Sequence, residues 1–128
     1  MKKSKTILIV EDEWPLMRAI GEKLTRNGFD TLQARTVDQA LEYLFDDDIS
    51  LPDLTWLDHY LPGKTEIDLV TAMKQDSSWG RIPIFLISNT AGPGKVSSYM
   101  QLGVNEYFVK SQNRLDNLVN EVKRFLKK

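Results

Sequence analysis

The 128-residue chain contains no cysteine and only one histidine. Without cysteine there can be no disulfide, no thiolate zinc site and no cysteine nucleophile. A single histidine cannot form the imidazole cluster that commonly holds a transition metal. Any metal ion bound by this chain would therefore be a hard cation held by oxygen ligands.

The chain also lacks an excess of charge of either sign and lacks long apolar runs. Seventeen Lys and Arg are balanced by eighteen Asp and Glu, for a net charge of −1. This balance argues against direct binding to nucleic acid or to an anionic membrane. The basic N-terminus is followed by only four apolar residues, 7–10, which fits neither a signal peptide nor a membrane span. We therefore expect a cytoplasmic protein, with residues 1–128 forming one domain.

Short apolar segments alternate with segments of helical period, a pattern typical of βαβ units around a parallel sheet. The first, third and fourth apolar segments are nearly continuous in apolar residues, as expected for strands covered by helices on both faces. The second segment alternates instead, which indicates an edge strand. The expected strands are residues 6–10, 31–34, 54–58, 82–88 and 107–110. The sequence thus predicts an α/β fold with a five-stranded parallel sheet.

Helices are predicted between these strands from apolar residues at helical spacing. Their expected ends agree with the spacing, since Thr36 and Gln39 form a capping-box pattern and Pro15 suits a first helical turn. Glycines 28, 80 and 103 follow expected helix ends. The residues expected to face the core are Met17, Ile20 and Leu24; Val37, Ala40, Leu41, Leu44 and Phe45; Leu69, Val70 and Met73; Val96, Tyr99 and Met100; and Leu115, Leu118, Val119, Val122, Phe125 and Leu126.

Polar side chains follow four of the expected strands. The carboxyl ends of parallel strands lie at one edge of the sheet, where ligands bind. Carboxylates brought together there repel one another unless a divalent cation lies between them, and Mg²⁺ prefers such oxygen ligands. The sequence therefore predicts a magnesium site at this edge. The side chains concerned are Glu11, Asp12 and Glu13, then Asp58, Ser88 and Lys110.

Asp58 stands at the end of an apolar strand, where a nucleophile would be rigidly held. A carboxylate can attack phosphorus to form an acyl phosphate, and the transferred group then needs a metal, an ammonium and a hydroxyl. Asp12, Lys110 and Ser88 could supply these three. Taken one at a time, they could equally be a helix cap, a solvated cation and a strand-end hydroxyl.

Together these residues resemble the receiver domains of two-component response regulators, and the chain is similar to the stand-alone chemotaxis regulator over nearly its whole length. The matched positions are Glu11, Asp12, Asp58, Ser88 and Lys110, with Tyr107 at the switch aromatic. The resemblance implies a doubly wound, flavodoxin-like sheet of strand order 2-1-3-4-5, with helices on both faces.

The resemblance also implies a function and a role for each matched residue. Asp58 would be the phosphoacceptor, taking a phosphoryl group from the phosphohistidine of a sensor histidine kinase or of a histidine phosphotransfer protein. The chain would pass the signal to an effector or output domain and would not be a turnover enzyme. Lys110 would pair with the phosphoryl group and Ser88 would hydrogen-bond it, while Tyr107 would change rotamer. The implied Mg²⁺ ligands are Asp12, Asp58 and the main-chain carbonyl of Tyr60, with Glu11 holding a metal-bound water.

The sequence departs from the family pattern at several positions. Glu66 replaces a usual glycine, so we expect a different backbone path after Asp58. Ser111 replaces a proline that often follows a cis bond, and a cis bond before another residue costs about 3 kcal/mol. We therefore expect the turn after Lys110 to be rebuilt. Asn89 replaces a small residue, and residues 92–94 form a Gly-Pro-Gly entry to the next helix that we expect to be mobile.

His59, Trp14 and Trp79 are given no catalytic role. His59 should point away from the side of Asp58, which favours an incidental role. We expect Trp14 to be a partly exposed packing residue and Trp79 to be a loop residue that closes the third helix.

Other functions remain as alternatives. The chain could be a receiver domain excised from a hybrid kinase or a larger transcriptional regulator. A haloacid-dehalogenase-type phosphohydrolase usually has a second aspartate two residues after its nucleophile, where this chain has Tyr60. A flavodoxin would need a phosphate-binding loop after the first strand, and the acidic residues 11–13 would repel a phosphate.

Overall fold

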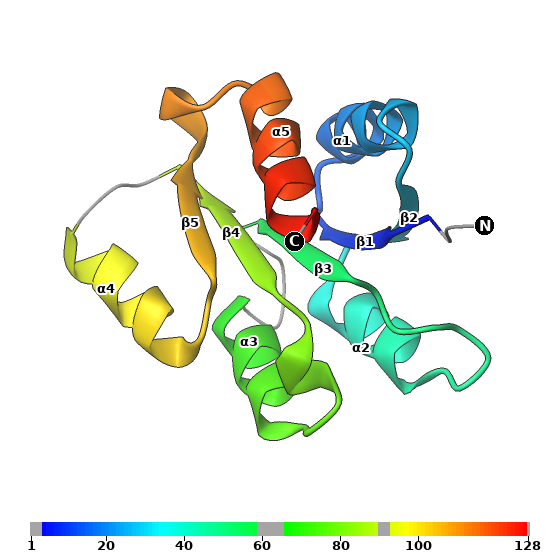
Figure 1. Cartoon of the computed structure of the whole chain (residues 1–128). Coiled ribbons are helices and arrows are strands. Elements are labelled where there is room, and N and C mark those ends of the chain that lie inside the picture. The colour runs from blue at the N-terminus through cyan, green and yellow to red at the C-terminus, as the bar shows by residue number, and fades with distance from the viewer. Residues whose placement is uncertain (1–3, 59–65, 90–92, 128) are drawn as a thin grey trace.

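A computed structural model describes residues 4–58, 66–89 and 93–127. Five parallel strands form one sheet in the order β2-β1-β3-β4-β5 (Figure 1). This confirms the predicted doubly wound sheet and places β2 at an edge, as predicted. The strands are β1 (Thr6–Val10), β2 (Asp30–Ala34), β3 (Leu54–Asp58), β4 (Ile84–Ser88) and β5 (Glu106–Val109). The helices are α1 (Trp14–Arg26), α2 (Val37–Phe45), α3 (Glu66–Gln75), α4 (Pro93–Leu102) and α5 (Leu115–Leu126), with short 3-10 helices η1 (Trp79–Arg81) and η2 (Lys110–Gln112).

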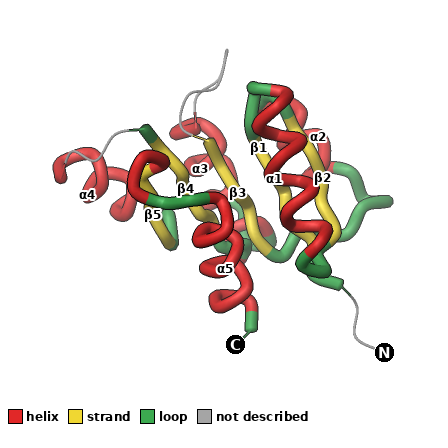
Figure 2. Tube along the Cα trace, turned by 90° about the horizontal axis from the view of Figure 1, so that it is seen from above, coloured by secondary structure: helices red, strands yellow, loops and turns green. Residues whose placement is uncertain are grey.

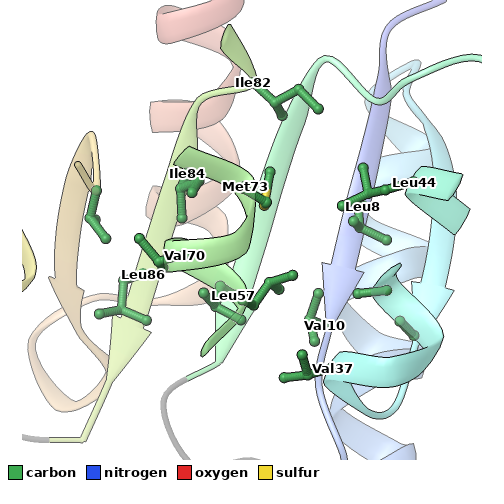
Figure 3. Close-up of a cluster of buried hydrophobic side chains, with 14 of the residues drawn as sticks. Leu8, Val10, Val37, Leu44, Leu57, Val70, Met73, Ile82, Ile84 and Leu86 are labelled. Carbon is green, nitrogen blue, oxygen red and sulfur yellow. The ribbon is translucent and has the colours of Figure 1, made fainter. Parts of the chain in front are cut away.

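The sheet lies between two layers of helices. Helices α1 and α5 cover one face, and α2, α3 and α4 cover the other (Figure 1, Figure 2). Strand residues alternate between two buried apolar clusters, so Ile7 and Ile9 face α1 and α5 whereas Leu8 and Val10 face the other layer. Figure 3 shows the cluster between the sheet and helices α2, α3 and α4, where Leu57 of β3 lies near Val70 of α3. Within the described residues, no helix is long and apolar enough to cross a membrane.

Local signals in the sequence account for several helix ends. The Thr36 hydroxyl accepts a hydrogen bond from the Gln39 amide at 3.1 Å, as a capping residue does. The Gln39 side chain accepts from the amide of Arg35 at 2.6 Å, one residue earlier than in the usual capping box. Gly28 and Gly103 have positive φ angles of 89° and 111° just after α1 and α4, a conformation that favours glycine.

Four strand boundaries differ from the prediction. Strands β2 and β5 each begin one residue earlier than predicted, at Asp30 and Glu106. Strand β4 begins at Ile84 rather than at residue 82, because Pro83 has no N–H to donate to the ladder. Strand β5 ends at Val109, and Lys110 begins η2 instead of ending the strand. All peptide bonds of the described residues are trans, so the turn between Lys110 and Ser111 is rebuilt, as predicted.

The prediction was wrong for two core residues and for one loop residue. Phe45 is the last residue of α2 and is 70% exposed, because its ring packs edge-on against Trp79 at 4.8 Å rather than entering the core. Met100 is 43% exposed, because the neighbouring Tyr99 is the residue that α4 directs inward. Trp79 begins the 3-10 helix η1 rather than lying in an irregular loop.

Candidate functional site

Three carboxylates meet at the carboxyl ends of β1 and β3. Glu11 directly follows β1, and its amide continues the sheet ladder by donating to the Ala34 carbonyl at 3.0 Å. Asp58 is the last residue of β3, where its backbone is paired with Ile87 of β4. One oxygen each from Glu11, Asp12 and Asp58 can be chosen so that all lie within 4.8 Å of one another.

Lys110 brings the compensating positive charge. Its Nζ lies 2.5 Å from Oδ1 of Asp58 and 3.9 Å from Oε1 of Glu11. The side chain is about a quarter exposed, whereas both carboxylates are almost fully buried. Although Lys110 lies in η2 rather than in β5, its ammonium group reaches the cluster, because η2 starts at the same edge of the sheet.

Ser88 and Tyr107 occupy neighbouring strands beside this cluster. Ser88 is the last residue of β4 and is completely buried, one position after Ile87, which is the register partner of Asp58. Tyr107 of β5 is the register partner of Leu86. Because side chains two residues apart share a face, Ser88 and Tyr107 both lie on the face covered by α2, α3 and α4.

Glu11 is a buried acid beside two other carboxylates. Burial and the nearby charge of Asp58 raise the pKa of Glu11 to about 7, although a hydrogen bond from the Glu13 amide and the charge of Lys110 oppose the shift. Oε2 accepts the Glu13 bond at 3.0 Å. Oε1 is buried and has no hydrogen-bond partner among the described residues.

The donor set fits a hard divalent cation. Carboxylate oxygens are the ligands that Mg²⁺ prefers, and Mg²⁺ usually takes one or two of them together with water and phosphate oxygens. A cation beside Glu11 would give its buried Oε1 a favourable electrostatic partner and would oppose the repulsion between the three acids.

Arg35, which the sequence analysis did not single out, holds the loop that carries Asp12. Its Nη2 and Nε donate to the main-chain carbonyl of Asp12 at 3.0 and 3.3 Å. The guanidinium also lies over the Trp14 ring, 6.0 Å from its centre. Trp14 is 53% exposed, in agreement with its prediction as a partly exposed packing residue. The available signal was the position of Arg35, directly after β2 at the same sheet edge.

Glu66 is the second functional candidate whose contacts the sequence did not indicate. It begins α3 and is buried, and its Oε1 accepts a hydrogen bond from the Tyr99 hydroxyl at 2.6 Å. The path of the backbone between Asp58 and Glu66 lies outside the described residues, as do His59, the Tyr60 carbonyl and Gly92. Asn89 is described and is exposed.

Two curated relatives show the range of proteins that this chain matches. It is 33% identical over 106 residues to the phosphate regulon transcriptional regulatory protein PhoB of Pseudomonas aeruginosa, covering 83% of this chain and 45% of PhoB. The chain therefore spans less than half the length of that relative. It is 32% identical over 105 residues to the chemotaxis protein CheY1 of Helicobacter pylori, covering 81% of this chain and 83% of CheY1.

A solved structure and the family comparison identify the same kind of protein as these relatives do. The phosphorylated cyanobacterial phytochrome response regulator RcpA superposes with a TM-score of 0.81 at 30% identity, covering 96% of this chain and 91% of RcpA. The model of the response regulator receiver domain matches residues 7–123, most of the chain. The fold thus has its counterpart in a known family, and the chain belongs to the response regulator receiver domains.

Proposed function

We propose that this chain is a magnesium-dependent phosphoacceptor switch of a two-component or phosphorelay system, with Asp58 as the phosphoacceptor. The family as a whole consists of regulatory phosphoacceptors rather than turnover enzymes. The observation that carries the proposal is the position of Asp58, buried at the end of β3 between a second carboxylate and the ammonium group of Lys110.

In the proposed reaction, a carboxylate oxygen of Asp58 attacks the phosphorus of a phosphohistidine. The phosphorus–nitrogen bond breaks, the imidazole leaves with its electron pair and takes up a proton, and an acyl phosphate remains on Asp58. Lys110 already contacts Asp58, so its ammonium would pair with a phosphoryl oxygen as charge develops there. The hydroxyl of Ser88, on the adjacent strand, would donate a hydrogen bond to another phosphoryl oxygen.

The acidic cluster would hold the metal. Asp12 and Asp58 would ligate Mg²⁺ directly, together with the main-chain carbonyl of Tyr60, and Glu11 would hold a water bound to the metal. When bound, Mg²⁺ supplies positive charge that offsets the charge of the phosphoryl oxygens. Glu11 itself positions the loop through the bond from the Glu13 amide.

The proposal extends to partners and organisation. The donor would be a sensor histidine kinase or a histidine phosphotransfer protein in the cytoplasm, and the recipient of the signal an effector or output domain. Residues 1–128 would act as one receiver domain, with Tyr107 changing rotamer as Ser88 moves toward the phosphoryl group. The chain matches both the chemotaxis protein CheY1 and part of the longer regulator PhoB, so a receiver excised from a larger regulator or a hybrid kinase stays the alternative to a stand-alone switch.

Intact-mass spectrometry after incubation with acetyl phosphate tests the proposal. We expect one added phosphoryl group in the presence of Mg²⁺ and none in the presence of a chelator. The Asp58→Asn variant should gain none, whereas Asp47→Asn, which alters an exposed acid far from the cluster in sequence, should react like the parent. Equal phosphorylation of Asp58→Asn and the parent would show that the assignment of Asp58 is wrong.

A further inference from the structure

A buried hydrogen bond joins α3 to α4 outside the acidic cluster. Tyr99 of α4 donates its hydroxyl to Oε1 of Glu66, the first residue of α3, at 2.6 Å. Both residues are about 5% exposed, although they are 33 positions apart in the chain. A hydrogen bond to a buried carboxylate is short and among the stronger kinds, so this contact ties the start of α3 to α4.

The same tyrosine contacts the residue assigned to the switch. The ring of Tyr99 lies 5.9 Å from the ring of Tyr107, tilted by 41°, and Tyr107 packs against the cluster that contains Tyr99. Figure 1 shows α3 and α4 on the same face of the sheet, beside β4 and β5. Glu66, Tyr99 and Tyr107 therefore form a continuous series of contacts from α3 to β5.

The position of Glu66 in the chain connects this series to the phosphoacceptor. Residues 59–65 join Asp58, at the end of β3, to Glu66, at the start of α3. Glu66, the first described residue after Asp58, thus has its side chain anchored on α4. This route to Tyr107 is separate from the one through Ser88, which approaches from β4.

We propose that Glu66 and Tyr99 are positioning residues that couple the state of the Asp58 site to α4 and to the Tyr107 ring. The inference rests on the proposed function for its phosphorylation step. Its structural part, the control of α4 and Tyr107 by one hydrogen bond, is independent of any phosphodonor. The surface formed by α4 and β5 would be affected. Glu66 and Tyr99 would thus set how this surface changes when Asp58 is phosphorylated.

The test uses Tyr99→Phe, which removes the hydroxyl and keeps the ring. Tyr43→Phe is the matched control, because the Tyr43 hydroxyl donates to the Gln33 carbonyl at 3.1 Å, on α2 and β2. Without a phosphodonor, we expect amide hydrogen exchange in residues 96–102 to be about ten to a hundred times faster in Tyr99→Phe than in the parent, the range that loss of one hydrogen bond to a carboxylate gives. Tyr43→Phe should leave α4 unchanged.

A second measurement distinguishes coupling from a merely structural contact. Fluorine NMR of 3-fluorotyrosine-labelled protein follows the Tyr107 ring before and after complete modification of Asp58 by acetyl phosphate and Mg²⁺, checked by mass. We expect the change at Tyr107 to fall below half of the parent value in Tyr99→Phe and to stay at the parent value in Tyr43→Phe. Glu66→Gln, which keeps an acceptor oxygen, should preserve most of the response.

Glu66→Ala should reproduce the effect of Tyr99→Phe, and the double variant should show no further loss. Equal responses in Tyr99→Phe and Tyr43→Phe would overturn the inference, as would a parent whose Asp58 is modified without any change at Tyr107. A parent that accepts no phosphoryl group would instead contradict the proposed function, and the exchange measurement alone would then decide the inference.

Discussion

The ammonium nitrogen of Lys110 lies 2.5 Å from Oδ1 of Asp58 and 3.9 Å from Oε1 of Glu11, so one cation faces two buried acids. This arrangement gives Lys110 two opposing effects. Its charge acts to lower the pKa of Glu11, and in the proposed reaction it neutralises charge on the transferred group. It also adds positive charge where a divalent cation would bind, which weakens metal binding.

Lys110→Ala should separate these effects. We expect phosphorylation of Asp58 by acetyl phosphate to slow by roughly 100-fold, as for other losses of a donor to developing charge. Mg²⁺ should bind at least about threefold more tightly, because the competing cation is gone. Tryptophan fluorescence titrations and timed mass spectrometry measure the two quantities. Lys127→Ala, at an exposed position, is the control. Weaker Mg²⁺ binding in Lys110→Ala would contradict this account of the charges.

Arg35 should support metal binding through the backbone of Asp12. Its two N–H groups hold the Asp12 carbonyl, so Arg35→Gln should weaken Mg²⁺ binding by about threefold to tenfold, the worth of one or two hydrogen bonds. Arg35→Lys keeps the charge but not the two-donor geometry, so we expect it to weaken binding as well. Isothermal titration calorimetry measures both variants. If Arg35→Lys binds like the parent, charge rather than geometry is the contribution of Arg35.

The fold was largely predictable because its signals are local. The apolar runs at β1 and β3 have the predicted bounds, and the alternation in β2 correctly indicated an edge. The errors concern side chains whose burial cannot be predicted from the spacing of apolar residues alone. Phe45 has core spacing but is the last residue of α2 and packs against Trp79, and Met100 shares its helix with the inward Tyr99.

The candidate site was partly predictable for a similar reason. Topology alone directs strand ends to one edge, which is why Glu11, Asp58 and Lys110 could be grouped before their distances were known. Arg35 and the Glu66–Tyr99 bond could not be grouped in this way, because their partners are set by the packing of loops and helices. Glu66 departs from the family pattern, and the sequence predicted only that it would alter the backbone path. Its role as a buried hydrogen-bond acceptor for Tyr99 was not predicted.

The buried hydroxyl of Thr55, in the central strand β3, should lower the free energy of unfolding. Its Oγ1 is fully buried and has no hydrogen-bond partner among the residues that the structure describes. Thr55→Val replaces this hydroxyl with a methyl group of similar shape and should raise the free energy of unfolding by about 1 kcal/mol. Thr36→Val, which removes the cap of α2, should lower it by about 1 kcal/mol. Urea unfolding gives both values, and a destabilised Thr55→Val would show that the hydroxyl is satisfied.

Glu11 should make the metal-free protein less stable as the pH rises. Burial raises the pKa of Glu11 from 4.5 to about 7, so between these values the folded protein retains a proton that the unfolded chain has lost. The contribution of protonated Glu11 to stability is therefore complete below pH 4.5 and is lost as the pH rises through 7, a difference on the order of 3 kcal/mol. Glu11→Gln keeps the shape without the titration.

Urea unfolding of both proteins between pH 5 and pH 8, in a chelator, isolates this contribution because all other titrating groups are shared. We expect Glu11→Gln to gain stability relative to the parent as the pH increases, with the two curves converging toward pH 5. Glu22→Gln, which alters an exposed acid paired with Arg18, should follow the parent. Since a divalent cation favours the ionised carboxylate, adding Mg²⁺ should reduce the pH dependence of the parent. Parallel curves for Glu11→Gln and the parent in the chelator would mean that Glu11 is ionised in the folded protein throughout this range.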